Sequence, residues 1–242
     1  MDKYIIKRFI ICSLCGFLLL SCSQQKATIN IAVASNFETT LKQIIPLYKE
    51  HIIDSLHINV IAASSGVLSS QIINNAPFDL FLSADNEKPS IIQQRLGSTQ
   101  SVNIYAIGQL ALWIPKAKDN NHCLAQLKDV KTLAIANPKT APYGKVAFEI
   151  LKNNNIEIQK IIRTSSVAQT YLYTQENLAQ AGFVALPMLK KESKGCIQIF
   201  QDNKLSQSMI LLNNKAKDFH DFLLSKEVQQ FIQDSGYISL SK

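Results

Sequence analysis

The chain has 242 residues, of which 47% are hydrophobic and 18% charged, and its formal net charge is +7. This composition excludes a disordered chain, and the length fits one large domain or two lobes. The basic residues are scattered and form no basic-aromatic stripe, so we expect no nucleic-acid partner.

Residues 1–21 have the pattern of a secretory signal peptide, because three basic residues precede an apolar run at 9–20 and a small residue follows. That run is shorter than the ~20 residues of a membrane-spanning helix. The sequence LLSC at 19–22 resembles the bacterial lipoprotein box, in which the cysteine is lipidated. We therefore predict a lipid on Cys22 and a polar tether over 22–28, with a plain secretory peptide as the alternative. Without the signal peptide the net charge falls to +5.

Along the rest of the chain, strand-like apolar runs alternate with helical patterns, which predicts an α/β fold with largely parallel sheets. The expected strands cover 29–34, 58–63, 78–84, 104–115, 132–137, 181–189, 197–200 and 208–212. The expected helices cover 37–48, 68–73, 89–96, 145–154, 167–177 and 216–236. The segment 104–115 is long for one strand and has Gly108 in its middle, so it is a candidate for a bent crossover between two lobes.

One type of junction recurs at 30–38, 60–72, 134–151 and 163–174: a strand runs into a turn of small polar residues, and the turn opens a helix. The start of a helix leaves backbone N–H groups without intrahelical partners and carries partial positive charge. In open α/β sheets such turns gather at the carboxyl ends of the strands. Several helix starts directed at one point would form an anion site without a charged side chain.

The first two junctions carry hydroxyl groups. Ser35 and Asn36 stand where the first helix begins, although Ser35 with Glu38 also fits a capping box, which is the ordinary structural alternative. In the second junction, Ser65 and the glycine after it let side-chain and backbone donors approach a ligand closely.

The other two junctions add a phenol and a free backbone group. Tyr143 lies in a Pro-Tyr-Gly turn, and the Ser-Ser turn at 165–166 leaves the N–H of Val167 near the start of a helix. None of the four turns contains a carboxylate, apart from Glu38 in the expected capping box. A site with donors only favours an oxyanion that carries no proton at neutral pH.

A resemblance becomes specific at these turns. The segments VASNFETTLKQIIPLYKEH, SSGVLSSQI, NNAPFDLFLSADNEKP, ANPKTAPYGKVAFEIL and GFVAL, in this order and spacing, resemble the periplasmic molybdate-binding proteins of ABC importers. The resemblance extends from about Ile29 to the C-terminus. It implies a two-lobed periplasmic-binding-protein fold of type II with two crossover strands. It also implies a molybdate or tungstate dianion held by neutral donors between the lobes, an ABC permease as partner, no cofactor and no enzymatic activity.

Carried over by position, the resemblance implies ligand contacts from Ser35, Asn36, Ser65, Tyr143 and the backbone N–H of Val167. Many members of the family have a tyrosine where this chain has Ala185, and a branch without it has a tyrosine at the position of Tyr143. This chain resembles that branch. The expected lobes are 29–106 with 209–242, and 107–208, in a monomer on the periplasmic side of a bacterial membrane.

Two other classes of function remain to be compared. A binding protein for sulfate or thiosulfate would need similar donors, whereas a binder of small carboxylates would use an arginine fork, and only Arg163 is near a candidate turn. A serine hydrolase would need a nucleophile, a base and an acid, but the chain has no G-x-S-x-G elbow and its four histidines lie away from the turns.

Two cysteines, Cys123 and Cys196, remain in the predicted mature chain. An exported compartment permits a disulfide between them, but the sequence does not tell whether they lie within reach, so both states remain open. Neither belongs to a C-x-x-C motif, which disfavours a zinc or thioredoxin-type site.

Overall fold

The computed structural model describes residues 28–50, 56–117, 119–189, 194–238 and 240. Its strands are β1 (Thr28–Ala34), β2 (His57–Ala63), β3 (Leu80–Leu82), β4 (Val102–Ile114), β5 (Thr132–Ala136), β6 (Lys160–Thr164), β7 (Ala181–Ala185) and β8 (Cys196–Leu211). Its α-helices are α2 (Glu38–Glu50), α3 (Ser65–Ile73), α4 (Glu87–Arg95), α5 (Cys123–Gln126), α6 (Pro142–Asn153), α7 (Val167–Gln175), α8 (Lys217–Leu223) and α9 (Lys226–Asp234).

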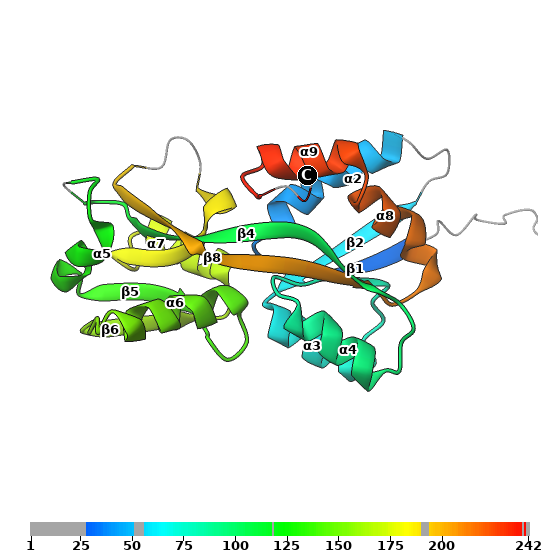
Figure 1. Ribbon diagram of the computed structural model, residues 1–242, viewed down its shortest axis with the longest axis horizontal. Coiled ribbons are helices and arrows are strands. Elements are labelled where there is room, and N and C mark those ends of the chain that lie inside the picture. Colours follow the sequence, from blue (N-terminus) through cyan, green and yellow to red (C-terminus); the bar gives the residue numbers. More distant parts are fainter. Residues whose placement is uncertain (1–27, 51–55, 118, 190–193, 239, 241–242) are drawn as a thin grey trace, which may run out of the picture.

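The strands form one eight-stranded sheet in the order β2-β1-β3-β8-β4-β7-β5-β6. Three strands at each end are parallel, because β1 pairs with β2 and β3, and β5 pairs with β6 and β7. In the middle, β4 and β8 run antiparallel to each other and extend along most of the length of the molecule (Figure 1). The expected α/β class with two crossover strands is confirmed.

Each half of the sheet has its own hydrophobic core. One core gathers side chains of β1, α2, α8, α9 and the start of β4, with Phe37, Tyr105 and Phe219 fully or almost fully buried. The other gathers side chains of β4, β5, β7 and α6, among them Leu112 and Phe183. We call the part of the chain around the first of these cores the first lobe and the part around the other the second lobe. The helices α3 and α4 belong to the first lobe, where they pack on a smaller hydrophobic cluster.

The strand β8 differs from the prediction of two separate strands at 197–200 and 208–212. The polar residues between them continue the strand because they pair with β4, for example Gln207 with Ala106. The register shifts where Gln109 pairs with Lys204 but the next residue pairs with Phe200. Such an irregularity bends a strand pair, and here it lies beside Leu110 and Leu205 of the second core. A second shift, between Ile104 and Ala106, lies at the first core.

Smaller differences have local causes. The predicted helix at 216–236 is two helices, since Ser225 starts α9 by accepting a hydrogen bond from the N–H of Val228 at 3.4 Å. Gly236, with φ of +94°, follows this helix, where glycine is favoured because it adopts the left-handed conformation at low cost. The strand expected over 78–84 is reduced to the three residues of β3.

The predicted signal peptide, Cys22 and nearly all of the tether lie outside the described residues. Within the described part of the chain, no helix has both the length and the hydropathy needed to cross a membrane.

The structure resolves the open question about the cysteines. Cys123, at the start of α5, forms a disulfide with Cys196, the first residue of β8, and their Cα atoms are 5.6 Å apart. Both residues are buried in the core of the second lobe. The bond therefore closes a loop that contains most of that lobe.

Replacing both cysteines, Cys123→Ala with Cys196→Ala, should lower the free energy of unfolding by roughly 2–5 kcal/mol. The physical reason is that the disulfide restricts the unfolded chain. Urea unfolding monitored by circular dichroism measures the change, with the wild-type protein under reducing conditions as a control. An unchanged unfolding midpoint in both samples would contradict this role.

Candidate functional site

The starts of α3, α6 and α7, and the turn before α2, surround one small cavity. Each follows a strand, namely β2, β5, β6 and β1. The cavity is lined by ten residues without a charged side chain: Ala34, Ser35, Asn36, Ser64, Ser65, Ala84, Ala141, Pro142, Tyr143 and Val167. The structure thus brings together all five residues that the sequence singled out for a ligand.

The cavity is narrow. Its volume is about 10 Å³, near the minimum that holds one water molecule. A tetrahedral oxyanion is larger, so its entry requires the two lobes to move apart. A wider hollow of about 450 Å³ between α2 and α7 shares Ser35 and Asn36 with the cavity and leads to the solvent.

On the first lobe, Ser35 does not form the expected capping box. Its hydroxyl oxygen accepts a hydrogen bond from the N–H of Ala168 at 3.4 Å, because it faces the start of α7 on the second lobe. Glu38 instead pairs with Lys42 on its own helix, with 2.6 Å between carboxylate and ammonium. The turn before α2 is therefore directed at the cleft and not at its own helix.

Two serines at the start of α3 supply hydroxyl groups. The Ser65 oxygen accepts a hydrogen bond from the N–H of Ala84 at 2.9 Å, which leaves its own proton to be donated. Ser64 is only 4% exposed, and its hydroxyl has no hydrogen-bond partner among the described residues. Ser64 was not among the ligand contacts predicted from the sequence, although the Ser-Ser-Gly turn at 64–66 contained the signal.

The second lobe supplies a phenol and a backbone group. Tyr143 lies in the first turn of α6 and is buried, and burial, together with the Tyr237 phenol, raises its pKa well above 10. It therefore stays protonated and can donate. Val167 is the first residue of α7, so its N–H has no carbonyl partner within the helix. Gly108 leaves room for the phenol, because a Cβ there would lie 2.1 Å from its oxygen.

A buried polar network lies behind the cavity, and sequence reasoning missed it. Gln207 accepts hydrogen bonds at Oε1 from Asn36 Nδ2 (2.9 Å) and from the Tyr105 hydroxyl (3.0 Å). Its Nε2 donates to the Tyr143 oxygen (3.1 Å). Tyr237 donates to the backbone oxygen of Asn36 (2.8 Å) and accepts from Asn36 Nδ2 (3.2 Å). The network connects both lobes.

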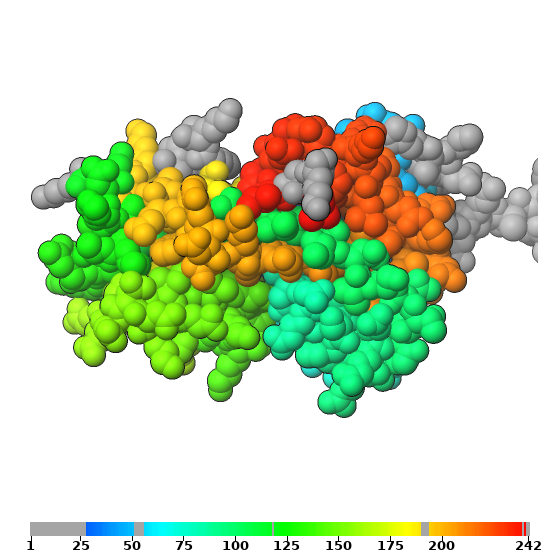
Figure 2. Space-filling view, viewed as in Figure 1, coloured from blue at the N-terminus to red at the C-terminus, as the bar shows by residue number. Residues whose placement is uncertain are grey.

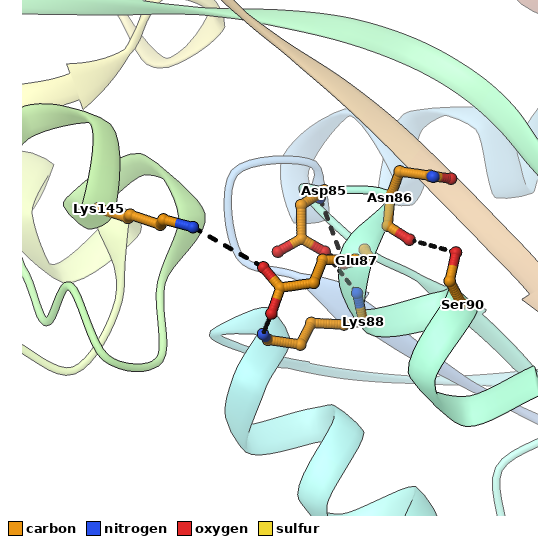
Figure 3. A network of polar contacts seen from close by, with 7 residues as sticks. Asp85, Asn86, Glu87, Lys88, Ser90 and Lys145 are labelled. Carbon is orange, nitrogen blue, oxygen red and sulfur yellow. Dashed lines mark hydrogen bonds and ion pairs between the residues drawn. The ribbon is translucent and has the colours of Figure 1, made fainter. Parts of the chain in front are cut away.

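The lobes also touch directly beside the cavity. The N–H of Gly66 donates to the backbone oxygen of Thr140 at 2.8 Å. Nearby, Lys145 of α6 reaches toward Glu87 of α4, with 3.9 Å between the charged atoms (Figure 3). A hydrogen bond and the charge of Lys88 lower the pKa of Glu87, which keeps this carboxylate ionised. In the face shown in Figure 2, the surfaces of α6 and α3 meet along a seam.

Other candidate residues lie elsewhere. Arg163 is exposed on β6 and does not line the cavity, so the arginine fork of a carboxylate site is missing there. Ala185 is buried in β7 opposite Leu110, and the phenol that lines the cavity is Tyr143. The described residues contain no group of three or more histidine, cysteine, aspartate or glutamate side chains that could hold a metal ion.

Comparison with known proteins agrees with this geometry. The family model described as "Bacterial extracellular solute-binding protein" matches residues 29–238. The chain belongs to this family. The molybdate-binding protein ModA of Azotobacter vinelandii is 35% identical over 187 residues, which cover 74% of this chain and 73% of the relative. ModA of Rhodobacter capsulatus is 31% identical over 222 residues, covering 86% of this chain and 87% of the relative.

A third relative is described as a putative ABC transporter substrate-binding lipoprotein, YvgL of Bacillus subtilis, 24% identical and aligned over 89% of this chain and 88% of the relative. Among solved structures, the periplasmic molybdate-binding protein of Azotobacter vinelandii matches with a TM-score of 0.81 and 25% identity, covering 88% of this chain and all of that chain. The sulfate-binding protein SubI of Mycobacterium tuberculosis has a TM-score of 0.69 at 11% identity and covers 89% and 88%, a likeness of fold alone.

The contact at Gly66 predicts that Gly66→Ala prevents the lobes from closing. An added Cβ would lie 2.8 Å from the Thr140 oxygen, so the backbone hydrogen bond between the lobes could not form unchanged. Small-angle X-ray scattering should give a larger radius of gyration for Gly66→Ala than for wild type.

Ser70→Ala is the matched control, because Ser70 is exposed on the same helix. Gly66→Ala should be no less stable than wild type toward unfolding, because alanine has a higher helix propensity than glycine. Identical scattering from the Gly66 variant, the control and wild type would contradict this prediction.

Proposed function

We propose that this protein captures molybdate or tungstate outside the cytoplasm and delivers the anion to an ABC importer. The observation that carries the proposal is a cavity at four helix starts whose lining contains hydroxyl, phenol and backbone donors and no charged side chain. A tetrahedral dianion without a proton needs donors on every side and no acceptor. Helix starts supply such donors at fixed positions and with partial positive charge.

The identity of the anion rests on the relatives. Sulfate has the same shape and charge as molybdate, so the types of donor do not separate the two, and the selection depends largely on the size of the closed cavity. Two relatives above 30% identity are named molybdate-binding proteins. We therefore assign molybdate or tungstate as the ligand, with sulfate or thiosulfate as the alternatives to be tested.

The proposed contacts are Ser35, Ser65, Tyr143, the Val167 N–H and Asn36. Both amide hydrogens of the Asn36 side chain are already donated to Gln207 and Tyr237. We therefore propose that Asn36 contacts the anion through its backbone N–H. Ser64 is added as a candidate donor because its buried hydroxyl has no partner in the described part of the chain.

In the proposed mechanism, one lobe comprises 29–106 and 209–242 and the other 107–208, and they open and close by bending β4 and β8. Closure brings donors of both lobes onto the anion and removes water, which strengthens each hydrogen bond. The closed form then docks on the permease. No turnover is proposed: the lining residues include no histidine, aspartate or glutamate that could serve as a general base.

We also propose that the protein acts as a monomer held at the membrane by a lipid on Cys22. The lipoprotein-like LLSC sequence and the description of the Bacillus subtilis relative support this anchoring. Each buried methylene of an acyl chain contributes ~0.8 kcal/mol, so more than one chain is needed for stable attachment.

Isothermal titration calorimetry with molybdate, tungstate, sulfate and phosphate tests the assignment. We expect molybdate and tungstate to bind more tightly than sulfate, and phosphate to bind weakest, because it is partly protonated at neutral pH and the lining offers its proton no carboxylate. Equal or tighter binding of sulfate would refute the assignment to molybdate.

The substitution Ser65→Ala tests the placement of the site. It removes a hydroxyl donor to a charged ligand, so it should weaken molybdate binding by roughly 1.5–3 kcal/mol. Ser70→Ala, at the exposed serine of the same helix, should bind like wild type. If Ser65→Ala kept wild-type affinity, the proposed site would be wrong.

A further inference from the structure

We propose that Gln207 is a positioning residue for the anion: its side-chain amide fixes the direction in which Tyr143 donates and ties this donor to the Asn36 turn of the other lobe. This inference rests on the proposed function. Gln207 does not line the cavity, so it acts through the residues that do. Its place in the middle of a polar stretch of β8 gave no hint of this role in the sequence.

The position of Gln207 allows its amide to reach both lobes. The residue is fully buried on β8, opposite Ala106 of β4, where the strand pair passes from one lobe to the other. One end of the amide meets Asn36, 171 residues away in the sequence, and the other meets Tyr143, 64 residues away. No other side chain among the described residues bonds both of these proposed contacts.

The hydrogen bonds of the network are consistent in direction. The Tyr237 hydroxyl donates its proton to the backbone carbonyl oxygen of Asn36, and the side-chain Nδ2 of Asn36 donates to Gln207 Oε1. Gln207 Nε2 then donates to the oxygen of Tyr143. Because this oxygen already accepts a hydrogen bond from the amide, the Tyr143 proton is left for another acceptor. The only space that Tyr143 lines among the described cavities is the proposed anion site.

A carboxylate at the same position would reverse this arrangement. It can only accept hydrogen bonds, so Tyr143 would turn its proton away from the cavity toward residue 207, and a negative charge would lie behind a site for a dianion. When protonated, a glutamic acid again offers one donor and one acceptor and resembles glutamine. Gln207→Glu should therefore make anion binding depend on pH.

The three phenols around Gln207 do not titrate in the range of this test. They belong to Tyr105, Tyr143 and Tyr237, and burial is the main cause that raises the pKa of each. The carboxylate of Asp85 is also close enough to contribute to the raised pKa of Tyr105. A pH dependence that appears only in the variant would therefore come from residue 207.

The experiment is calorimetric titration of molybdate into wild type, Gln207→Glu and Gln229→Glu at pH 8 and pH 6. Gln229 is the matched control, since it is also buried but donates to the backbone oxygens of Tyr105 and Leu223. We expect Gln207→Glu to bind about tenfold or more weakly than wild type at pH 8 and to regain affinity at pH 6. Wild type and Gln229→Glu should show no such recovery.

Binding by Gln207→Glu at wild-type strength at pH 8, or an equal loss at both pH values, would overturn the positioning role. If that variant does not fold, Gln207→Met is the second test, because it keeps the length of the side chain but removes its three hydrogen bonds. It should fold and bind molybdate weakly, and binding at wild-type strength would overturn the role. If wild type binds sulfate but not molybdate, the proposed ligand fails while the same comparison with sulfate still tests Gln207. If wild type binds none of the four anions, both proposals fail.

Discussion

The gathering of hydrogen-bond donors at four helix starts is the constraint on which the rest of this structure depends. The first N–H groups of a helix have no carbonyl partner within that helix, and the helix starts around the cavity belong to both lobes. Bringing the lobes together is therefore favourable when an acceptor lies between them. An oxyanion without a proton supplies hydrogen-bond acceptors in all directions. A protonated oxyanion also presents an O–H donor, and an N–H group cannot accept a hydrogen bond from it. Selectivity and closure follow from the same groups.

The long strands β4 and β8 make this arrangement possible. They are the structural elements common to both lobes, and their pairing shifts register twice, once beside each core. The hydrogen bonds of Gln207, the contact of Gly66 with Thr140 and the bond from Ala168 to Ser35 all join parts of the chain that are far apart in sequence. The disulfide between Cys123 and Cys196 is buried in the same hydrophobic cluster as the cavity-lining Tyr143 and Val167.

Local patterns predicted what depends on local structure. The alternation of strands and helices and the four polar turns follow from periodicity and helix-start chemistry, and all five turn residues line one cavity. Sequence patterns gave incomplete or wrong predictions where a contact with a distant part of the chain determines the structure. The polar middle of β8 resembles a loop until β4 pairs with it, and Ser35 fits a capping box until Ala168 competes for its hydroxyl. Gln207 carries no local signal, because only the folded chain brings it between Asn36 and Tyr143.

Crystals grown with molybdate would locate the bound ion without prior assumptions, because molybdenum scatters anomalously. We expect one strong peak in the cavity, with the oxygens of the ion within hydrogen-bond distance of Ser35, Ser65, the Tyr143 hydroxyl and the Val167 N–H. No lysine or arginine should contact the ion. A peak beside a basic side chain elsewhere on the protein, with the cavity free of molybdenum, would show that the anion does not bind at the helix starts.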